Sequence, residues 1–115
     1  MFYRSVKSDP PTERDFLSSA DLGKRPPRSD PAFLHVWAGL SVFDTYEQAR
    51  SNAHYWRWRH GEYIAELIVP SAAPIIFEGP NEVGHWNLYD APASQLLNWV
   101  SRVVHGPSTL SVAPP

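Results

Sequence analysis

The sequence predicts a single α+β domain with a mostly antiparallel sheet. Residues 2–6 alternate bulky and polar side chains, and residues 63–69 form a mostly apolar run, as strands do. After Thr45, apolar residues recur at spacings of three and four, as they do on a helix. A strand comes first, helices follow, and strands dominate the second half, an order that favours α+β architecture. Twelve prolines among 115 residues predict short elements joined by many turns.

The composition is that of a folded protein without cysteine chemistry. Hydrophobic residues make up 43% of the chain and charged residues 19%, so a packed core is expected over residues 1–107, followed by a flexible tail at 108–115. The absence of cysteine excludes disulfides, thiolate nucleophiles and cysteine-based zinc sites, and the histidines lack metal-ligand spacing, so no metal is expected. No apolar run reaches membrane-spanning length and no signal peptide opens the chain, which predicts a cytoplasmic protein.

The first half of the chain predicts two strands and three helices. A strand is expected at 2–6, and Thr12 with Asp15 has the spacing of a capping box that begins a short helix over 12–20. Asp30 before Pro31 predicts a second helix that ends near Gly39. A strand at 40–43 then precedes a third helix, which begins at Thr45 and ends at His60 and Gly61.

Side-chain spacing on the third helix predicts two faces. The core face is expected to carry Tyr46, Ala49, Ala53 and Trp56, and the basic face Arg50, His54 and Arg57. The second half predicts strands over 63–69, 75–77, 85–89 and 100–104, with a short helix from Pro92 through Leu97.

Three residues are candidates for chemistry, each with a structural alternative. Arg4 can grip a phosphate from a rigid strand, or it is an edge-strand arginine that faces solvent or pairs with a carboxylate. The Ser41 hydroxyl can bond a ribose or an amide, or be satisfied by the backbone. Glu66 is the one charged residue in an apolar strand, so it is paired, or faces solvent, or lines a cleft. A cleft carboxylate can stabilise positive charge or act as a base.

Basic charge and aromatic residues gather in the first half. Residues up to His60 include nine Lys and Arg against seven Asp and Glu, which favours a phosphate-bearing ligand or an acidic partner. Residues 55–60 interleave aromatics with arginines, as platforms for single-stranded nucleic acid do; the alternative is a helix with a basic surface and an aromatic core. His85 is placed either at the rim of a site or in solvent.

Five segments together form a pattern: Tyr3-Arg4, Trp-Ala-Gly-Leu-Ser-Val at 37–42, the alanine-spaced helix from Ala49 to Ala53, Tyr-Ile-Ala-Glu-Leu at 63–67 and Gly-His-Trp-Asn-Leu-Tyr at 84–89. In this pattern the chain resembles a family of small bacterial proteins of unassigned activity. More distantly, the layout is similar to the ADP-ribosyltransferase superfamily, which includes the Arg-Glu-Ser-domain NAD-degrading toxins and the RNA 2′-phosphotransferases. This similarity implies an ADP-ribosyltransferase-like fold with NAD as substrate.

The distant similarity also implies roles for individual residues. Arg4 would hold the dinucleotide phosphates, Ser41 would orient the ribose or amide, and Glu66 would assist cleavage of the nicotinamide–ribose bond. The expected binding residues around them are Tyr3, Phe43, His54 and His85. Two departures from the pattern are visible: Phe43 replaces the toxins' pocket tyrosine, and residues 52–54 hold no counterpart of their helical glutamate.

Three functions are consistent with these features of the sequence. The first is an NAD-binding ADP-ribosyltransferase-like protein, a toxin or defence effector that acts on a small-molecule nucleotide. The second is a non-catalytic interaction module of immunity or adaptor type, which would hold a protein partner through residues 24–28 and exposed aromatics. The third is an RNA-binding protein that uses Arg50, Arg57 and Arg59.

Overall fold

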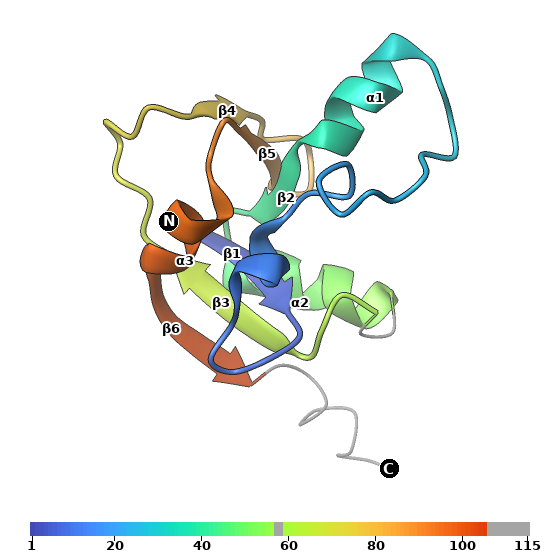
Figure 1. Ribbon diagram of the computed structural model, residues 1–115. Coiled ribbons are helices and arrows are strands. Elements are labelled where there is room, and N and C mark those ends of the chain that lie inside the picture. The colour runs from blue at the N-terminus through green and yellow to red at the C-terminus, as the bar shows by residue number, and fades with distance from the viewer. Residues whose placement is uncertain (57–58, 106–115) are drawn as a thin grey trace.

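Six strands and four short helices make up the described part of the fold. The computed structural model (Figure 1) describes residues 1–56 and 59–105. In chain order the elements are β1 (Phe2–Val6), the 3₁₀ helix η1 (Glu13–Phe16), α1 (Pro31–Ala38), β2 (Leu40–Phe43), α2 (Tyr46–Tyr55), β3 (Tyr63–Leu67), β4 (Ile76–Glu78), β5 (His85–Tyr89), α3 (Ala93–Asn98) and β6 (Val100–His105). The predicted α+β class is confirmed.

The strands form one sheet in which every pairing is antiparallel. The order across the sheet is β4-β5-β2-β1-β3-β6, so the first strand in sequence lies near the centre. β1 and β3 pair along their whole length, from Phe2 opposite Leu67 to Val6 opposite Tyr63. β1 is therefore flanked by the strands β2 and β3, and both of its faces are covered by other parts of the chain.

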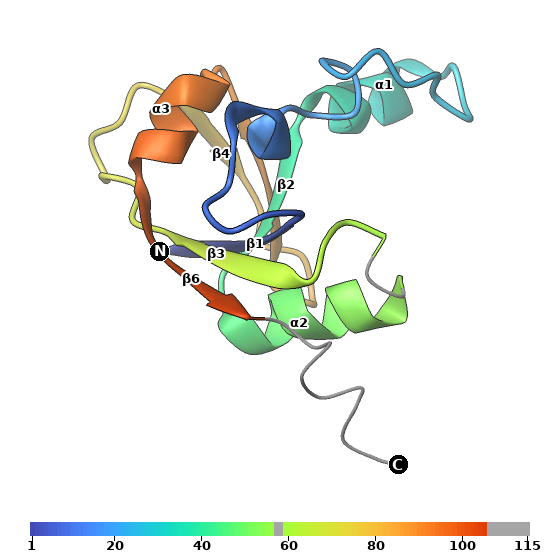
Figure 2. The same ribbon diagram turned by 60° about the horizontal axis from the view of Figure 1, so that its bottom comes forward.

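β1 and β2 stay paired at one point only. Their single register pair is Tyr3 opposite Phe43, after which β2 turns away from β1. Figure 2 shows β2 running across the direction of β1 and β3. The separation of two neighbouring strands opens the sheet beside Arg4, and the cleft described below lies there.

The two faces of the sheet carry separate apolar clusters. On one face Phe2, Val6 and Leu67 pack with Phe16 of η1 and Leu96 of α3. On the other, a smaller cluster of Phe43, Ala49, Ala53 and Ile64 is covered by α2. Figure 2 shows α3 and α2 on opposite sides of β1 and β3. Because side chains alternate along a strand, neighbouring residues of β1 serve different faces.

Side-chain caps begin two of the helices where the sequence predicts them. The Asp30 carboxylate accepts the Phe33 N–H at 3.2 Å, and Pro31 takes the first helical position of α1. The Thr45 hydroxyl accepts the Gln48 N–H at 3.1 Å at the start of α2. α1 has no buried residue and contacts the sheet through His35, whose ring stacks on Tyr89 of β5 and whose Nε2 lies 2.8 Å from Glu78 Oε1 of β4.

Several predicted boundaries were wrong. The helix expected over 12–20 is only the 3₁₀ turn at 13–16, because Leu17 is already extended. The third helix ends at Tyr55, so Trp56 leaves the expected core face and is 42% exposed. The predicted strands at 63–69 and 75–77 are β3 and β4, which end at Leu67 and begin at Ile76. The expectations for Arg57 and for the tail at 108–115 lie outside the described residues.

No helix in the described ranges is long and apolar enough to cross a membrane. The longest of them, α2, has 10 residues, about half of what a bilayer core requires.

Candidate anion-binding cleft

Arg4 bridges the opening between β1 and β2. Its Nε donates to the carbonyl oxygen of Asp15, and its Nη1 donates to the carbonyl oxygen of Ser41, both at 2.7 Å. These bonds join β1 to the η1 turn and to β2 where no ladder bond does. They use two of the five N–H groups of the guanidinium.

Arg4 forms no ion pair with a carboxylate of the described residues. Across the described ranges, the ion pairs join Arg28 to Asp30, His35 to Glu78 and Arg102 to Glu66. The nearest acid to Arg4, Asp15, instead accepts the backbone N–H groups of Lys7 and Thr12 at 2.9 Å. Burial lowers the pKa of Arg4 to about 10 despite the opposing charge of Asp15, so the guanidinium remains a cation at neutral pH.

Two adjoining cavities meet at this guanidinium. One of about 140 Å³ extends between the strands, and the other, of about 220 Å³, extends along the end of β1. Both are lined by Arg4, Ser5, Leu22, Lys24 and His60. We call the two cavities together the Arg4 cleft.

The Arg4 cleft is electropositive. The basic residues on its walls are Arg4, Lys7, Arg14, Lys24 and Arg59, against one acid, Asp15. The pKa of the His60 imidazole is affected by these charges. Burial lowers this pKa most, and the positive charges of Arg4, Lys24, Lys7 and Arg59 lower it further. An anion placed in the cleft would relieve this repulsion among like charges.

Ser41 and His85 form a hydrogen-bonded pair at the wall of the cleft. Ser41 Oγ and His85 Nε2 are 2.6 Å apart, and the Phe43 ring meets the imidazole edge-on with centroids 5.3 Å apart. Burial lowers the pKa of His85, which favours the neutral imidazole. A neutral Nε2 without its proton accepts the Ser41 hydroxyl hydrogen, and the serine oxygen can then accept from a ligand.

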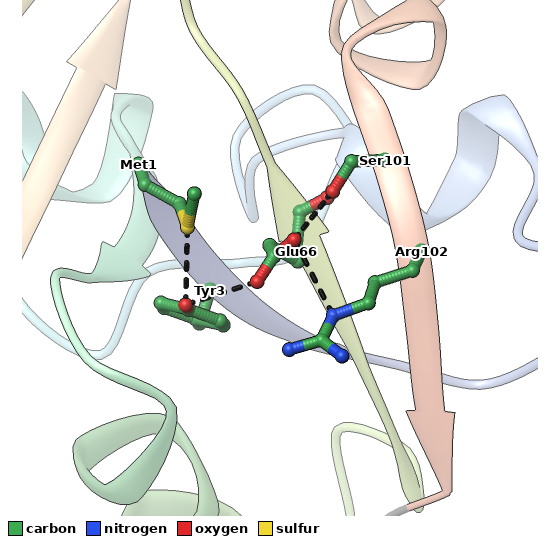
Figure 3. Close-up of polar contacts among 5 residues, drawn as sticks. All are labelled: Met1, Tyr3, Glu66, Ser101 and Arg102. Atoms are coloured by element: carbon green, nitrogen blue, oxygen red, sulfur yellow. Dashed lines mark hydrogen bonds and ion pairs between the residues drawn. The ribbon is translucent and has the colours of Figure 1, made fainter.

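Glu66 lies apart from the Arg4 cleft. Its strand partner is Tyr3, whereas Arg4 is opposite Ala65, so Glu66 and Arg4 point to opposite faces of the sheet. Figure 3 shows the surroundings of Glu66: Tyr3 Oη donates to Oε2 at 3.0 Å, Ser101 Oγ donates to Oε1 at 2.6 Å, and Arg102 Nε is 3.4 Å from Oε1. The Tyr3 hydroxyl also lies 3.1 Å from the Met1 sulfur.

The expectation of a solvent-facing Glu66 was wrong. The residue is 7% exposed, because β6 and Tyr3 cover it. The Ser101 hydrogen bond is the main cause that lowers the pKa of its carboxyl, with Tyr3 and Arg102 acting in the same direction against burial. A carboxylate held by these donors is suited to joining β1, β3 and β6.

The predicted site residues are thus divided among three places. Arg4, Ser41 and Phe43 line the cleft, and His85 contacts it through Ser41. Tyr3 and Glu66 form the separate cluster on the α2 side of the sheet. His54 is exposed on α2 and is not among the residues that line the cleft.

Other cleft residues were not predicted as ligand contacts. Ser18 and Ser19 follow η1, Lys24 belongs to the basic connector, and Asn52 and His60 come from α2 and the turn after it. Asn52 is one of the positions, 52–54, that hold no counterpart of the helical glutamate of the Arg-Glu-Ser-domain toxins. Nothing local marks these residues, since they meet only through the loop between β1 and α1 and the splay of the sheet.

The described part of the chain contains no group of three or more His, Asp or Glu residues that could hold a metal ion. Comparison with protein-family models, with curated proteins and with solved structures finds no match to this chain. What can be inferred about function rests on the geometry of the Arg4 cleft and its surroundings.

Proposed function

We propose that the protein binds a phosphorylated nucleotide in the Arg4 cleft, and that NAD is the ligand to test first. The observation that supports this most directly is a part-buried guanidinium, held by two carbonyl oxygens, that forms no ion pair with a carboxylate in the described part of the chain. Phosphate oxygens are the acceptors that arginine prefers at such a site. Lys24 lines both cavities with it and supplies a second cation.

The size of the cleft supports phosphate binding with the rest of the ligand at its mouth. Cavities of about 140 and 220 Å³ are each smaller than the roughly 300–1,000 Å³ that enclose a drug-sized molecule. A diphosphate fits this space, whereas the nucleoside parts would extend over the rim. Ser41 then meets a ribose hydroxyl or carboxamide that donates a hydrogen bond.

Binding is better supported than bond cleavage by Glu66. Stabilising a positive ribose requires a carboxylate at the reacting carbon. Glu66 points to the other face and is engaged by Tyr3 and Ser101. Asp15, the acid on the cleft wall, has both oxygens bonded to backbone N–H groups.

A titration of NAD followed by calorimetry tests the proposal. NAD at about 100 times its dissociation constant should also stabilise the fold by about 2.7 kcal/mol. Lys24→Ala and Arg4→Lys should weaken binding about tenfold or more, because each removes a phosphate contact. Arg28→Ala is the matched control, since Arg28 pairs with Asp30 and does not line the cleft. Unchanged affinity in both cleft variants would exclude the site.

A second candidate function is protein interaction through α1. Leu34 and Val36 are 40% and 49% exposed on a helix with no buried residue, and Arg28 lies 5.7 Å from the Phe33 ring. Residues two apart on a helix point about 200° away from each other, so Leu34 and Val36 offer apolar contacts on two sides of α1 to a partner that wraps around the helix. Arg28 is already paired with Asp30. If α1 is the functional surface, the double variant Leu34→Ser with Val36→Ser abolishes co-purification of a defined partner from the source cells, and Lys24→Ala leaves this co-purification intact. Loss of the partner in Lys24→Ala alone would contradict the role of α1.

A further inference from the structure

Two exposed aromatic rings are connected to the wall of the Arg4 cleft through His60. Tyr55 and Trp56, at the end of α2, are 75% and 42% exposed. Their rings meet edge-on with centroids 5.2 Å apart, and Trp56 meets the His60 imidazole at 6.2 Å. His60 lines both cavities of the cleft. A continuous path of rings therefore leads from the cationic walls to the surface.

The exposure of Trp56 follows from where α2 ends. Trp56 is the C-cap residue, with φ −87° and ψ 12°, and its N–H still bonds to the carbonyl of Asn52. Helical spacing would place its indole under the sheet with Ala49 and Ala53, but both of those are buried and Trp56 is not. The ring is thus available to a flat partner.

We propose that the base of a nucleotide stacks on the indole face of Trp56 while its phosphates bind Arg4 and Lys24. The His60 imidazole, inclined by 72° to the indole, would contact the edge of that base, and we call the Trp56–His60 pair the platform. The inference rests on the proposed function and names the part of the ligand that lies outside the cavities. Base–aromatic stacking contributes about 1–3 kcal/mol, comparable to a phosphate contact, and tolerates any base. Arg59, on the cleft wall beside His60, adds a cation near the ribose or phosphate.

The charge state of His60 supports this role. Burial and the surrounding cations lower the pKa of His60, so its ring is neutral at neutral pH. A neutral imidazole can contact the base of the nucleotide without adding to the repulsion among the cations Arg4, Lys24 and Arg59.

The ligand inferred is a mononucleotide or dinucleotide and not a nucleic-acid strand. The platform adjoins two small cavities, one of about 140 Å³ and one of about 220 Å³, that suit one or two phosphates. A strand binder instead needs a groove that tracks several phosphates. Oligonucleotide binding is therefore an outcome that would argue against the inference.

Titration with ADP and with pyrophosphate separates the base from the phosphates. ADP should bind about 5- to 150-fold more tightly than pyrophosphate, the factor that corresponds to one stacked base. Trp56→Ala should remove most of this difference and leave pyrophosphate affinity unchanged, whereas Trp56→Phe should retain it. Ile76→Ala, a substitution of an exposed apolar residue on β4, is the control and should bind both ligands as the parent does.

Failure of the platform is distinguishable from failure of the cleft. Equal affinity for ADP and pyrophosphate, both weakened by Lys24→Ala and neither by Trp56→Ala, would overturn the platform and leave the phosphate site standing. If neither ligand binds, both the platform and the proposed function are wrong. If an RNA oligonucleotide binds at least tenfold more tightly than ADP, the platform serves a strand and the inference is overturned.

Discussion

Arg4 donates a 2.7 Å hydrogen bond to the carbonyl oxygen of Ser41 at the point where β1 and β2 have ceased to pair. The bond substitutes a side chain for the missing backbone ladder, so the strands can separate without leaving that carbonyl unsatisfied. One side chain thus supports the opening in the sheet and supplies the central cation of the cleft.

Arg4→Ala should lower the free energy of unfolding by about 1–3 kcal/mol, because it removes the donors to two partly buried carbonyl groups. Urea unfolding followed by circular dichroism measures the change. Arg28→Ala, which removes an exposed ion pair, should change stability by less than about 0.5 kcal/mol. Equal effects of the two substitutions would show that the Arg4 bonds contribute nothing specific.

Glu66 should make the fold sensitive to acid. The Ser101 and Tyr3 hydrogen bonds and Arg102 lower the pKa of Glu66 below its ordinary 4.5, so its stabilising contribution is complete above that value. The contribution is lost as the pH falls through the lower, folded-state pKa. In denaturant unfolding between pH 6 and pH 3, Glu66→Gln should be less stable than the parent at pH 6, with a smaller gap at pH 3. A constant gap would contradict the pKa shift.

The affinity for NAD should rise as the pH falls from about 7.5 to 5.5, if the proposed site is correct. Burial and the charges of Arg4, Lys24, Lys7 and Arg59 lower the pKa of His60, and a bound diphosphate offsets those charges and raises it again. The protonated form therefore binds more tightly. Calorimetry at several pH values measures this, and His60→Asn should flatten the profile. Parallel pH profiles for the parent and the variant would exclude His60 as the cause.

Gly61→Ala should destabilise the protein by about 3 kcal/mol or more. Gly61 has φ +116° and its added Cβ would overlap the Val6 carbonyl. Gly23→Ala is the matched control, since Gly23 has φ +73° but open space around it, and should cost only about 1 kcal/mol. Thermal unfolding compares the two. Similar losses would mean that backbone conformation, and not the contact of Gly61 with Val6, sets the cost.

Local pattern was sufficient for most of the elements. The strands at 2–6, 40–43 and 85–89 have the predicted bounds because alternation and turn residues act over a few positions. The caps at Asp30 and Thr45 are equally local. Helix ends were less predictable: residues 17–20 and Trp56 have helical spacing in sequence, but the helices stop before them.

Which residues come together in the candidate site was harder to predict than the helices and strands. Arg4, Ser41 and Glu66 were expected to act together, and the register of β1 with β3 places Arg4 and Glu66 on opposite faces. His60 was considered as the end of a helix and within the aromatic and basic segment at 55–60, and Lys24 only within the connector at 24–28 that would hold a protein partner. Lys24 reaches the cleft from the loop between β1 and α1, and His60 reaches it from the turn between α2 and β3, so the two meet only in the folded chain.

The sequence by itself determined the α+β class, the order of elements and the presence of a phosphate-binding type of residue on the first strand. These properties depend on side-chain periodicity and capping, which act between residues close in the chain. The tertiary structure alone decided that β1 and β2 separate, that Ser41 meets His85 and that Trp56 is exposed beside His60. Such relationships depend on strand register and twist, which are settled by packing between residues far apart in the chain.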